Sequence, residues 1–207
     1  MLTEFDVISK HRIILHYLKI KIFLFCSANT INVANNGSNS IEVGFFKNLG
    51  PYQPSFDPER TINIAPGDSK GVKLADGWEG RVQKLSGAAA DPATWAEIHF
   101  DGYQGMTFCD ISLIRGFNGA MQFSSHDGSL RTGFTNDLYS DAPNQFKTKD
   151  ASDYNVLQPT QPYSGGTNDE LVKYYRSRVP TGDAFILPND FASVHGTKDK
   201  IINLNIY

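Results

Sequence analysis

Apolar and polar side chains alternate from residue 30 onward, which is the pattern of half-buried β-strands. Ile31 and Val33 belong to the first alternating stretch, and the alternation resumes at residues 41–45. Between them lies the segment Asn35-Asn36-Gly37-Ser38-Asn39, whose Asn and Gly residues adopt left-handed backbone conformations at little cost. The pattern therefore predicts a β-hairpin with this segment as its turn.

Five further stretches show the same alternation, and the first of them is followed by a second turn sequence, Pro66-Gly67-Asp68. These stretches are residues 61–64, 77–85, 94–100, 106–114 and 201–207. Short strands at such close spacing are typical of a β-sandwich or a β-barrel. The sequence therefore predicts an all-β fold.

One short helix interrupts this pattern near the carboxyl end. Thr167-Asn168-Asp169-Glu170 has the form of a capping box, and it leads into a run containing Leu171 and Tyr175. We expect a helix of two or three turns. Residues 126–166 are rich in Asp, Asn, Ser, Gly and Pro, so we expect long loops there, held on the sandwich by isolated aromatic side chains. These aromatic residues are Phe134, Tyr139, Phe146, Tyr154 and Tyr163.

The composition is that of a globular protein with no signal for nucleic-acid binding. The 207 residues are 40% hydrophobic and 20% charged, and 19 basic against 22 acidic side chains give a net charge of −3. A protein that neutralises phosphates needs the opposite balance. The two cysteines, Cys26 and Cys109, are too few for a disulfide framework and lack the spacing of a metal site. We expect neither a metal nor another cofactor.

Residues 1–28 differ from the rest of the chain. A basic stretch precedes the apolar run of residues 22–26 and the small residues Ser27 and Ala28, which is the order of parts in a secretory signal peptide. Lys19 and Lys21 shorten the apolar run, so a mis-assigned start of the reading frame and an ordinary helix remain alternatives. The run is too short for a transmembrane span, which needs about 20 apolar residues.

Strand parity brings candidate chemistry onto one face of the sheet. In residues 94–100 the apolar side chains share one face, and Glu97 and His99 point to the other. If this strand pairs with residues 106–114, Asp110 can lie on the same face as Glu97, with His99 between them. Two carboxyl groups whose pKa values are pushed apart can serve as acid and base. The alternative is a pair of surface carboxylates bonded to local backbone.

Several ordered segments resemble the thaumatin-like proteins, also called osmotin-like or pathogenesis-related family five. They are Thr30 to Asn36, Gly77-Trp78-Glu79-Gly80-Arg81, Pro92 to Ile98, Asp110 to Asn118 with Met121, Tyr174 to Pro180, and Asp183 to Phe185. The resemblance covers residues 30–207 and implies one domain over residues 29–207. The implied fold is a flattened antiparallel β-sandwich with loop-rich insertions around a cleft.

The family's cleft carries one Arg, one Glu and three Asp residues, and this chain matches part of that set. Glu97 and Asp110 match two of the acids, and Asp190 is the candidate for a third. Arg115 stands where many members have Asp, and the stretch 86–90, where we expect the family's Arg, has none. Arg115 would lower the pKa of Asp110, which makes Glu97 the better candidate acid. We expect these four residues and His99 to bind the substrate, with Glu97 and Asp110 as the catalytic candidates.

The resemblance also has a departure, because relatives of this size carry many disulfides. Cys109 lies on the apolar parity of its strand, so we expect a small buried hydrophobic residue there and a fold that depends on its aromatic core.

Three functions follow from the resemblance and the candidate residues. The first is a secreted, monomeric protein of cell-wall defence, antifungal in character, that binds β-1,3-glucan or a related polysaccharide in its cleft. The second is a weak endo-β-1,3-glucanase, with Glu97 as general acid. The third is a secreted effector or interaction protein that does not use the cleft.

Overall fold

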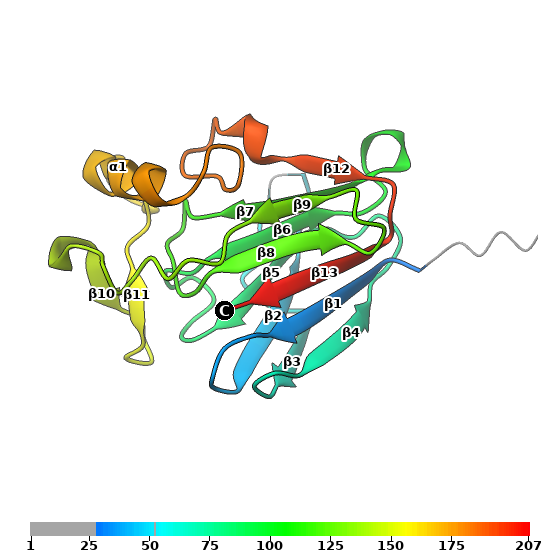
Figure 1. The fold of residues 1–207 in the computed structure, drawn as a ribbon, viewed down its shortest axis with the longest axis horizontal. Helices are drawn as coiled ribbons and strands as arrows, with labels where there is room; N and C mark the ends of the chain where they lie inside the picture. Colours follow the sequence, from blue (N-terminus) through cyan, green and yellow to red (C-terminus); the bar gives the residue numbers. More distant parts are fainter. Residues whose placement is uncertain (1–27, 52) are drawn as a thin grey trace, which may run out of the picture.

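Two β-sheets contain most of the strands in the computed structural model, which describes residues 28–51 and 53–207. The five-stranded sheet has the order β4-β1-β13-β8-β9. Its strands are β1 (Thr30–Asn35), β4 (Ser69–Lys73), β8 (Met121–Ser125), β9 (Arg131–Gly133) and β13 (Ile201–Ile206). Every pairing in it is antiparallel except that of β1 with β13, which is parallel. The chain thus closes by pairing its first described strand with its last (Figure 1).

The second sheet has six strands in the order β12-β7-β6-β5-β2-β3, and all its pairings are antiparallel. Its strands are β2 (Ile41–Lys47), β3 (Arg60–Ile64), β5 (Glu79–Leu85), β6 (Trp95–His99), β7 (Thr107–Ser112) and β12 (His195–Thr197). A two-stranded ribbon is formed by β10 (Lys147–Lys149) and β11 (Asn155–Leu157). The sheets, the ribbon and one short helix give the predicted all-β sandwich with loop-rich insertions.

The core lies between the two large sheets. Along β1 and β13 every second side chain is buried, as expected for strands with one face covered. Ile31 and Leu204 from one sheet, and Phe45, Val82 and Ile111 from the other, are fully buried in the same cluster. Cys109 is buried in that cluster with a free thiol, as predicted, whereas Cys26 lies outside the described residues.

The predicted hairpin of residues 30–45 is wrong, although both of its strands form. β1 pairs with β4 and β13, whereas β2 pairs with β3 and β5 in the other sheet. The connection after Asn35 therefore passes from one sheet to the other, and so does the connection between β3 and β4 through Pro66-Gly67-Asp68. Alternation identifies which face of a strand is buried, but it does not identify the partner strand.

Buried Asn35 stabilises this corner of the sandwich. Its side-chain amide donates to the carbonyl oxygens of Asn39 and Ile64, at 2.8 and 3.0 Å, and its Oδ1 accepts from the Gly37 amide at 3.0 Å. One side chain thus satisfies backbone groups of both connections between the sheets, which a buried corner needs.

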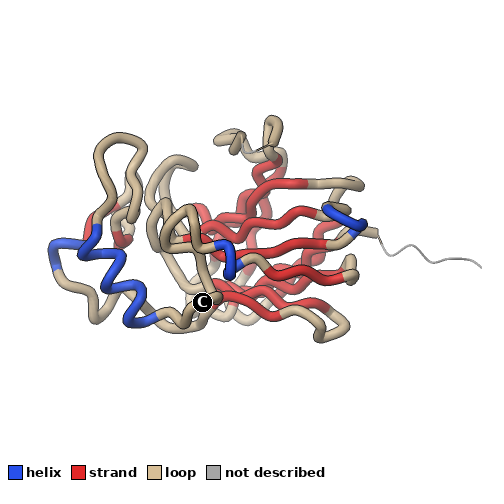
Figure 2. The backbone as a smooth tube through the Cα atoms, turned by 90° about the horizontal axis from the view of Figure 1, so that it is seen from above, coloured by secondary structure: helices blue, strands red, loops and turns tan. Residues whose placement is uncertain are grey.

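The helix α1 (Asp169–Arg178) lies to the side of the sandwich (Figure 2). Its N-cap is Asn168, one residue after the Thr expected from the capping box, and the Asn168 side chain accepts from the Leu171 amide. Leu171 and Tyr175 are buried beneath the helix, and Tyr174 donates its hydroxyl to the Leu138 carbonyl. The helix therefore packs on the loop region that precedes it.

The predicted loop region, residues 126–166, also contains β9, β10, β11 and the 3-10 helix η2 (Asn144–Phe146). Phe134 and Phe146 are buried and Tyr139 is half-buried, as expected for side chains that hold loops in place. Tyr154 and Tyr163 are 60% and 59% exposed, so these two do not serve as the anchors we expected.

Of the predicted amino-terminal segment, residues 1–28, only Ala28 is among the described residues. Within the part of the chain that the structure describes, no helix has the length and apolar character needed to cross a membrane.

Candidate functional site

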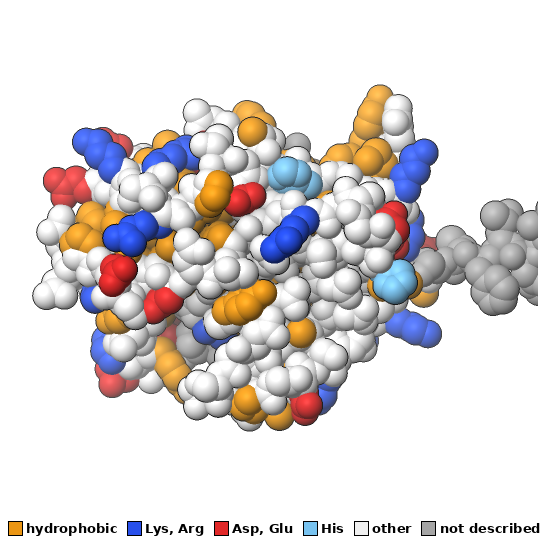
Figure 3. All heavy atoms as spheres, in the orientation of Figure 1, with side chains coloured by type: hydrophobic (Ala, Val, Ile, Leu, Met, Phe, Trp, Pro, Cys, Tyr) orange, Lys and Arg blue, Asp and Glu red, His pale blue; other side chains and the backbone are white. Residues whose placement is uncertain are grey.

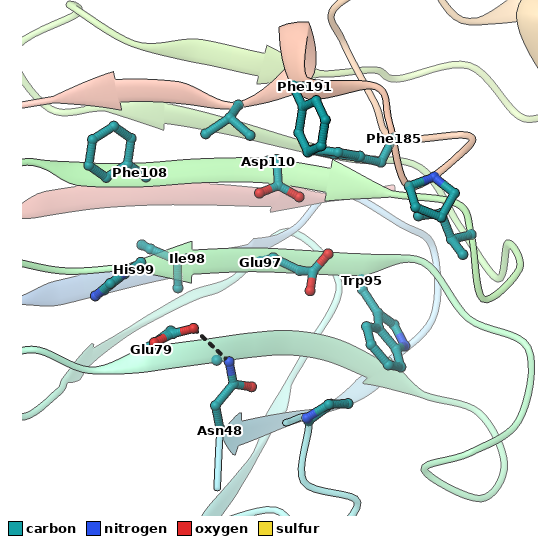
Figure 4. A pocket seen from close by; sticks show the side chains of 15 residues that line it. Asn48, Glu79, Trp95, Glu97, Ile98, His99, Phe108, Asp110, Phe185 and Phe191 are labelled. Atoms are coloured by element: carbon teal, nitrogen blue, oxygen red, sulfur yellow. Dashed lines mark hydrogen bonds between the residues drawn. The ribbon is translucent and has the colours of Figure 1, made fainter. Parts of the chain in front are cut away.

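Three charged side chains lie in register across the outer face of the six-stranded sheet. Arg81 on β5 is opposite Glu97 on β6, and Glu97 is opposite Asp110 on β7. All three alternate with buried core residues on their own strands, which directs them away from the core. The predicted pairing of the two carboxyl groups on one face is thus present in the structure (Figure 4).

A cavity of about 500 Å³ covers this part of the sheet. Glu97 and Asp110 line it together with the aromatic side chains of Trp95 and Phe108, which belong to the same two strands. Phe185 and the 73% exposed Phe191 close the opposite side, from the loop and the 3-10 helix η3 (Phe191–Ser193) before β12. The site is therefore a carboxyl pair inside a largely aromatic cavity.

Arg81 lies beneath this cavity and is 1% exposed. Its guanidinium carbon is 4.1 Å from the Phe46 ring centre and 4.0 Å from that of Trp95, so the cation is stacked between two aromatic faces. Nε donates to Gln83 Oε1 at 3.1 Å and Nη1 donates to the Ser55 carbonyl at 2.6 Å. Burial lowers the pKa of Arg81 to about 10, so the group remains a cation at neutral pH.

The environment of Asp110 favours its neutral form. Burial raises the pKa of its carboxyl well above the ordinary value, and the neighbouring charge of Glu97 and a hydrogen bond with Glu97 raise it further. The buried Oδ1 of Asp110 has no hydrogen-bond donor within reach among the described residues. Nothing described around that oxygen therefore stabilises a negative charge on it.

Glu97 experiences opposing effects. Burial raises its pKa, while Arg81, the hydrogen bond with Asp110 and Arg115 lower it. Glu97 is thus the more acidic member of the pair, and Asp110 keeps the proton and donates it in a hydrogen bond to the Glu97 carboxylate. Two carboxyl groups in contact commonly share one proton in this way.

In this arrangement Asp110 is the better candidate for the acid, whereas the sequence favours Glu97. We expected Arg115 to lower the pKa of Asp110, but its charge acts on Glu97. Arg115 does not line the cavity: its Nη1 donates to the Gln161 carbonyl at 2.7 Å, and its guanidinium lies 4.1 Å from the Tyr163 ring centre. Asp110, and not Glu97, is therefore the protonated acid of the pair.

His99 lines the cavity but does not lie between the two carboxyl groups. It is opposite Phe108 on β7 and Glu79 on β5, one step along the same face from Glu97. Because Glu97 and Asp110 are directly opposite each other, no side chain separates them (Figure 4). His99 therefore lies at the end of the cavity that Glu79 and Phe108 also line.

Asp190 is not among the residues that line the cavity. Its Oδ1 accepts from Arg176 at 2.5 Å, and its Oδ2 accepts from the amides of Ile186 and Leu187, both at 2.9 Å. Burial acts to raise the pKa of Asp190, but these hydrogen bonds and the Arg176 charge leave it below the ordinary value. The Asp190 carboxylate thus connects α1 to the loop that carries Phe185.

The candidate residues chosen from the sequence do not include Arg81 or the aromatic side chains that line the cavity. No arginine occupies residues 86–90, as noted, but the cleft cation comes from β5, within the segment Gly77-Trp78-Glu79-Gly80-Arg81. Parity could have identified it, because Val82 occupies the core face and leaves Arg81 on the face of Glu97. Phe185 and Phe191 lie about 75 residues beyond the sheet strands they cover, so no local pattern relates them to the site.

Among residues 28–51 and 53–207, no group of three or more His, Cys, Asp or Glu side chains is arranged to hold a metal ion.

Comparison with known proteins gives a sequence relative from a plant. A thaumatin-like protein of Actinidia deliciosa is 30% identical over 123 residues, which are 54% of this chain and 54% of the relative. The fold is thaumatin-like. Both the predicted resemblance and the predicted β-sandwich are therefore confirmed. The chain spans about half the length of this thaumatin-like relative, and no protein-family model matches.

Two solved structures are also similar to this chain. One is the protein elicitor MoHrip2 from Magnaporthe oryzae, with a TM-score of 0.45 and 11% identity over 86% of this chain and 98% of that one. The other is the thaumatin-like xylanase inhibitor TLXI, with a TM-score of 0.45 and 9% identity over 85% of this chain and 97% of that one.

Proposed function

We propose that this thaumatin-like chain is a secreted, monomeric protein that binds β-1,3-glucan or a related cell-wall polysaccharide in the cavity over β5, β6 and β7. The observation that carries the proposal is the pair of Glu97 and Asp110 at the floor of an aromatic cavity. A role in antifungal defence would follow from binding to a fungal wall polymer.

The chemistry of the pair suits sugar hydroxyl groups, which both donate and accept hydrogen bonds. The Glu97 carboxylate supplies acceptors, and the proton that the neutral Asp110 carboxyl donates to Glu97 holds that carboxylate in place. Aromatic rings of Phe108 and Phe191 offer apolar surface to the faces of sugar rings.

The same geometry favours binding over hydrolysis. Glycosidases hold their two carboxyl groups about 5–5.5 Å apart for retention or about 6.5–9.5 Å apart for inversion, with the scissile bond between them. The carboxyl groups of Glu97 and Asp110 interact directly with each other, an arrangement better suited to holding a sugar hydroxyl group than to placing a glycosidic bond between them. A weak endo-β-1,3-glucanase is the second candidate, because Asp110 holds a proton as a general acid must.

Binding to insoluble β-1,3-glucan tests the proposal with three variants. Glu97→Gln removes the acceptor and is expected to reduce the bound fraction at least tenfold, and Asp110→Ala is expected to do the same. Asp110→Asn keeps a neutral donor and is expected to bind like wild type at pH 7. Asp76→Asn makes the same chemical change on an exposed loop and serves as the matched control.

Reducing ends released from soluble β-1,3-glucan distinguish the two candidates. No release by wild type supports binding alone, whereas release that Asp110→Asn abolishes supports the glucanase. Full retention by a Glu97→Gln, Asp110→Ala double variant would contradict both and favour an interaction surface outside the cavity. The amino-terminal sequence of the native protein tests secretion, and we expect it to begin near Asn29.

A further inference from the structure

A lysine occupies an inward-facing position at the end of β5. Val82 on this strand is fully buried in the core, and Lys84, two residues further, points to the same side. Its register partner on β2 is Val43, which is also fully buried. Lys84 therefore stands at a position where the pattern of the sandwich calls for an apolar side chain.

Two cavities meet at this lysine. One has a volume of about 790 Å³ and the other about 280 Å³, and both are lined by Lys84, Asn118 and Asn155. Neither shares a lining residue with the carboxyl cavity described above. They form a separate region of the molecule, where β2, β5 and the loop around Asn118 come together.

Among the described residues, the Lys84 ammonium group makes no ion pair and no hydrogen bond, and burial lowers its pKa. Glu42 lines the larger cavity but is exposed, and Asp137 lines the smaller one. The Asp137 carboxylate already accepts from the Ser140 hydroxyl and the Tyr139 amide. Lys84 is half-buried, so its partly desolvated ammonium group gains more from an ion pair than a fully solvated lysine would.

The polar side chains around the larger cavity fall into two sets. Asn118 is fixed, because its amide donates to the Lys84 carbonyl and to Ser86 Oγ while its Oδ1 accepts from the Thr94 amide. The exposed side chains of Asn39, Asn63 and Asn155 also line the larger cavity, and they make no hydrogen bond among the described residues. Their amides are available to a ligand that both donates and accepts.

We propose that the larger cavity at Lys84 binds a carboxylate-bearing sugar. The ammonium group of Lys84 pairs with the carboxylate, and the asparagine amides form hydrogen bonds with the sugar hydroxyl groups. One cation at the inner end limits the ligand to one acidic group there. Several neutral amides and the 60% exposed Tyr154 ring suit a sugar body better than a small inorganic anion.

Titration calorimetry with two matched probes tests this site. A galacturonic acid trimer is expected to bind wild type, and the neutral galactose trimer is expected to bind at least tenfold more weakly. Lys84→Gln should reduce the affinity for the acidic trimer at least tenfold, whereas Lys73→Gln, the same change on an exposed part of β4, should leave it unchanged. Glu42→Gln should strengthen binding, since it removes a negative charge from the rim.

The thermal midpoint of Lys84→Gln separates loss of binding from loss of folding. Because the substitution removes a half-buried charge that has no partner among the described residues, we expect a midpoint equal to or above that of wild type. Asp110→Ala should leave binding of the acidic trimer unchanged, so the site stands or fails independently of the glucan proposal. Equal affinity for both trimers, undiminished binding by Lys84→Gln, absence of binding by wild type, or equal binding of inorganic phosphate would each overturn the inference.

Discussion

Glu97 and Asp110 lie directly opposite each other on β6 and β7, and their carboxyl groups share a hydrogen bond. Two negative charges in this arrangement would repel each other at short range and with little solvent screening. Arg81 lies opposite Glu97 on the neighbouring strand β5, and its charge lowers the pKa of Glu97, which leaves Asp110 as the better candidate for the neutral group. In this row across the sheet the cation thus lies next to Glu97, and the pKa of Asp110 is the more strongly raised of the two carboxyl groups.

Because Asp110 is neutral in the folded protein, we predict that its contribution to the free energy of unfolding falls as the pH rises. Because folding raises its pKa, the folded protein binds this proton more tightly than the unfolded chain does. The resulting stability is fully present below the ordinary pKa of an aspartate and is lost as the pH rises through the raised value. Asp110→Asn removes this dependence, so we expect the stability of the variant relative to wild type to increase between pH 4 and pH 9.

Urea unfolding of both proteins over this range measures the difference. The free-energy difference should grow by at most about 1.4 kcal/mol per pH unit and level off above the folded pKa. Acids that do not interact with Asp110, such as Asp190, cancel in the comparison because both proteins contain them. A difference that is independent of pH would show that Asp110 is ionised in the folded protein.

Arg81 is predicted to act on the cavity through Glu97. Arg81→Met keeps an apolar side chain between Phe46 and Trp95 but removes the cation, so the pKa of Glu97 should rise and its carboxylate should become a poorer acceptor. We expect glucan binding at pH 6 to fall about tenfold and to recover in part at higher pH. Arg131→Met, on the exposed edge strand β9, is the matched control. Loss of binding without recovery at higher pH would indicate a packing defect instead.

The alternation of apolar and polar residues predicted which side chains of the two strands share a face of the sheet. Glu97 and Asp110 belong to consecutive strands joined by a short turn, so alternation alone placed them on one face. The partner of β1 could not be predicted in the same way, because 165 residues separate the end of β1 from the start of β13 at Ile201. The electrostatic error has a similar cause, since the distance of Arg115 along the chain did not reveal that its charge acts on Glu97.

Asp190 is predicted to stabilise the loop that carries the aromatic wall of the cavity. Asp190→Asn weakens the bond to Arg176 and the hydrogen bonds from the Ile186 and Leu187 amides, and bonds of this charged kind contribute about 1.5–3 kcal/mol. We expect a loss of stability of about 2 kcal/mol at pH 7. Because folding lowers the pKa of Asp190, this contribution is present above its ordinary pKa and disappears as the pH falls through the folded value.

A double-mutant cycle with Arg176→Gln separates the two kinds of bond that Asp190 makes. If the ion pair dominates, the two substitutions should be far from additive. If the backbone amides dominate, Arg176→Gln should cost little stability by itself. Asp190→Asn should then cost nearly as much stability in the Arg176→Gln variant as it does in wild type.

Asn35 is predicted to be the most sensitive polar residue at the corner between the sheets. Asn35→Ala leaves the carbonyl oxygens of Asn39 and Ile64 without their donor, and an unsatisfied buried group costs about 1–3 kcal/mol. Asn36→Ala changes the neighbouring, exposed asparagine and should cost less than about 0.5 kcal/mol. Chemical unfolding of both variants measures the difference. Equal costs at the two positions would mean that solvent, and not the side chain, satisfies the backbone where the chain passes between the sheets.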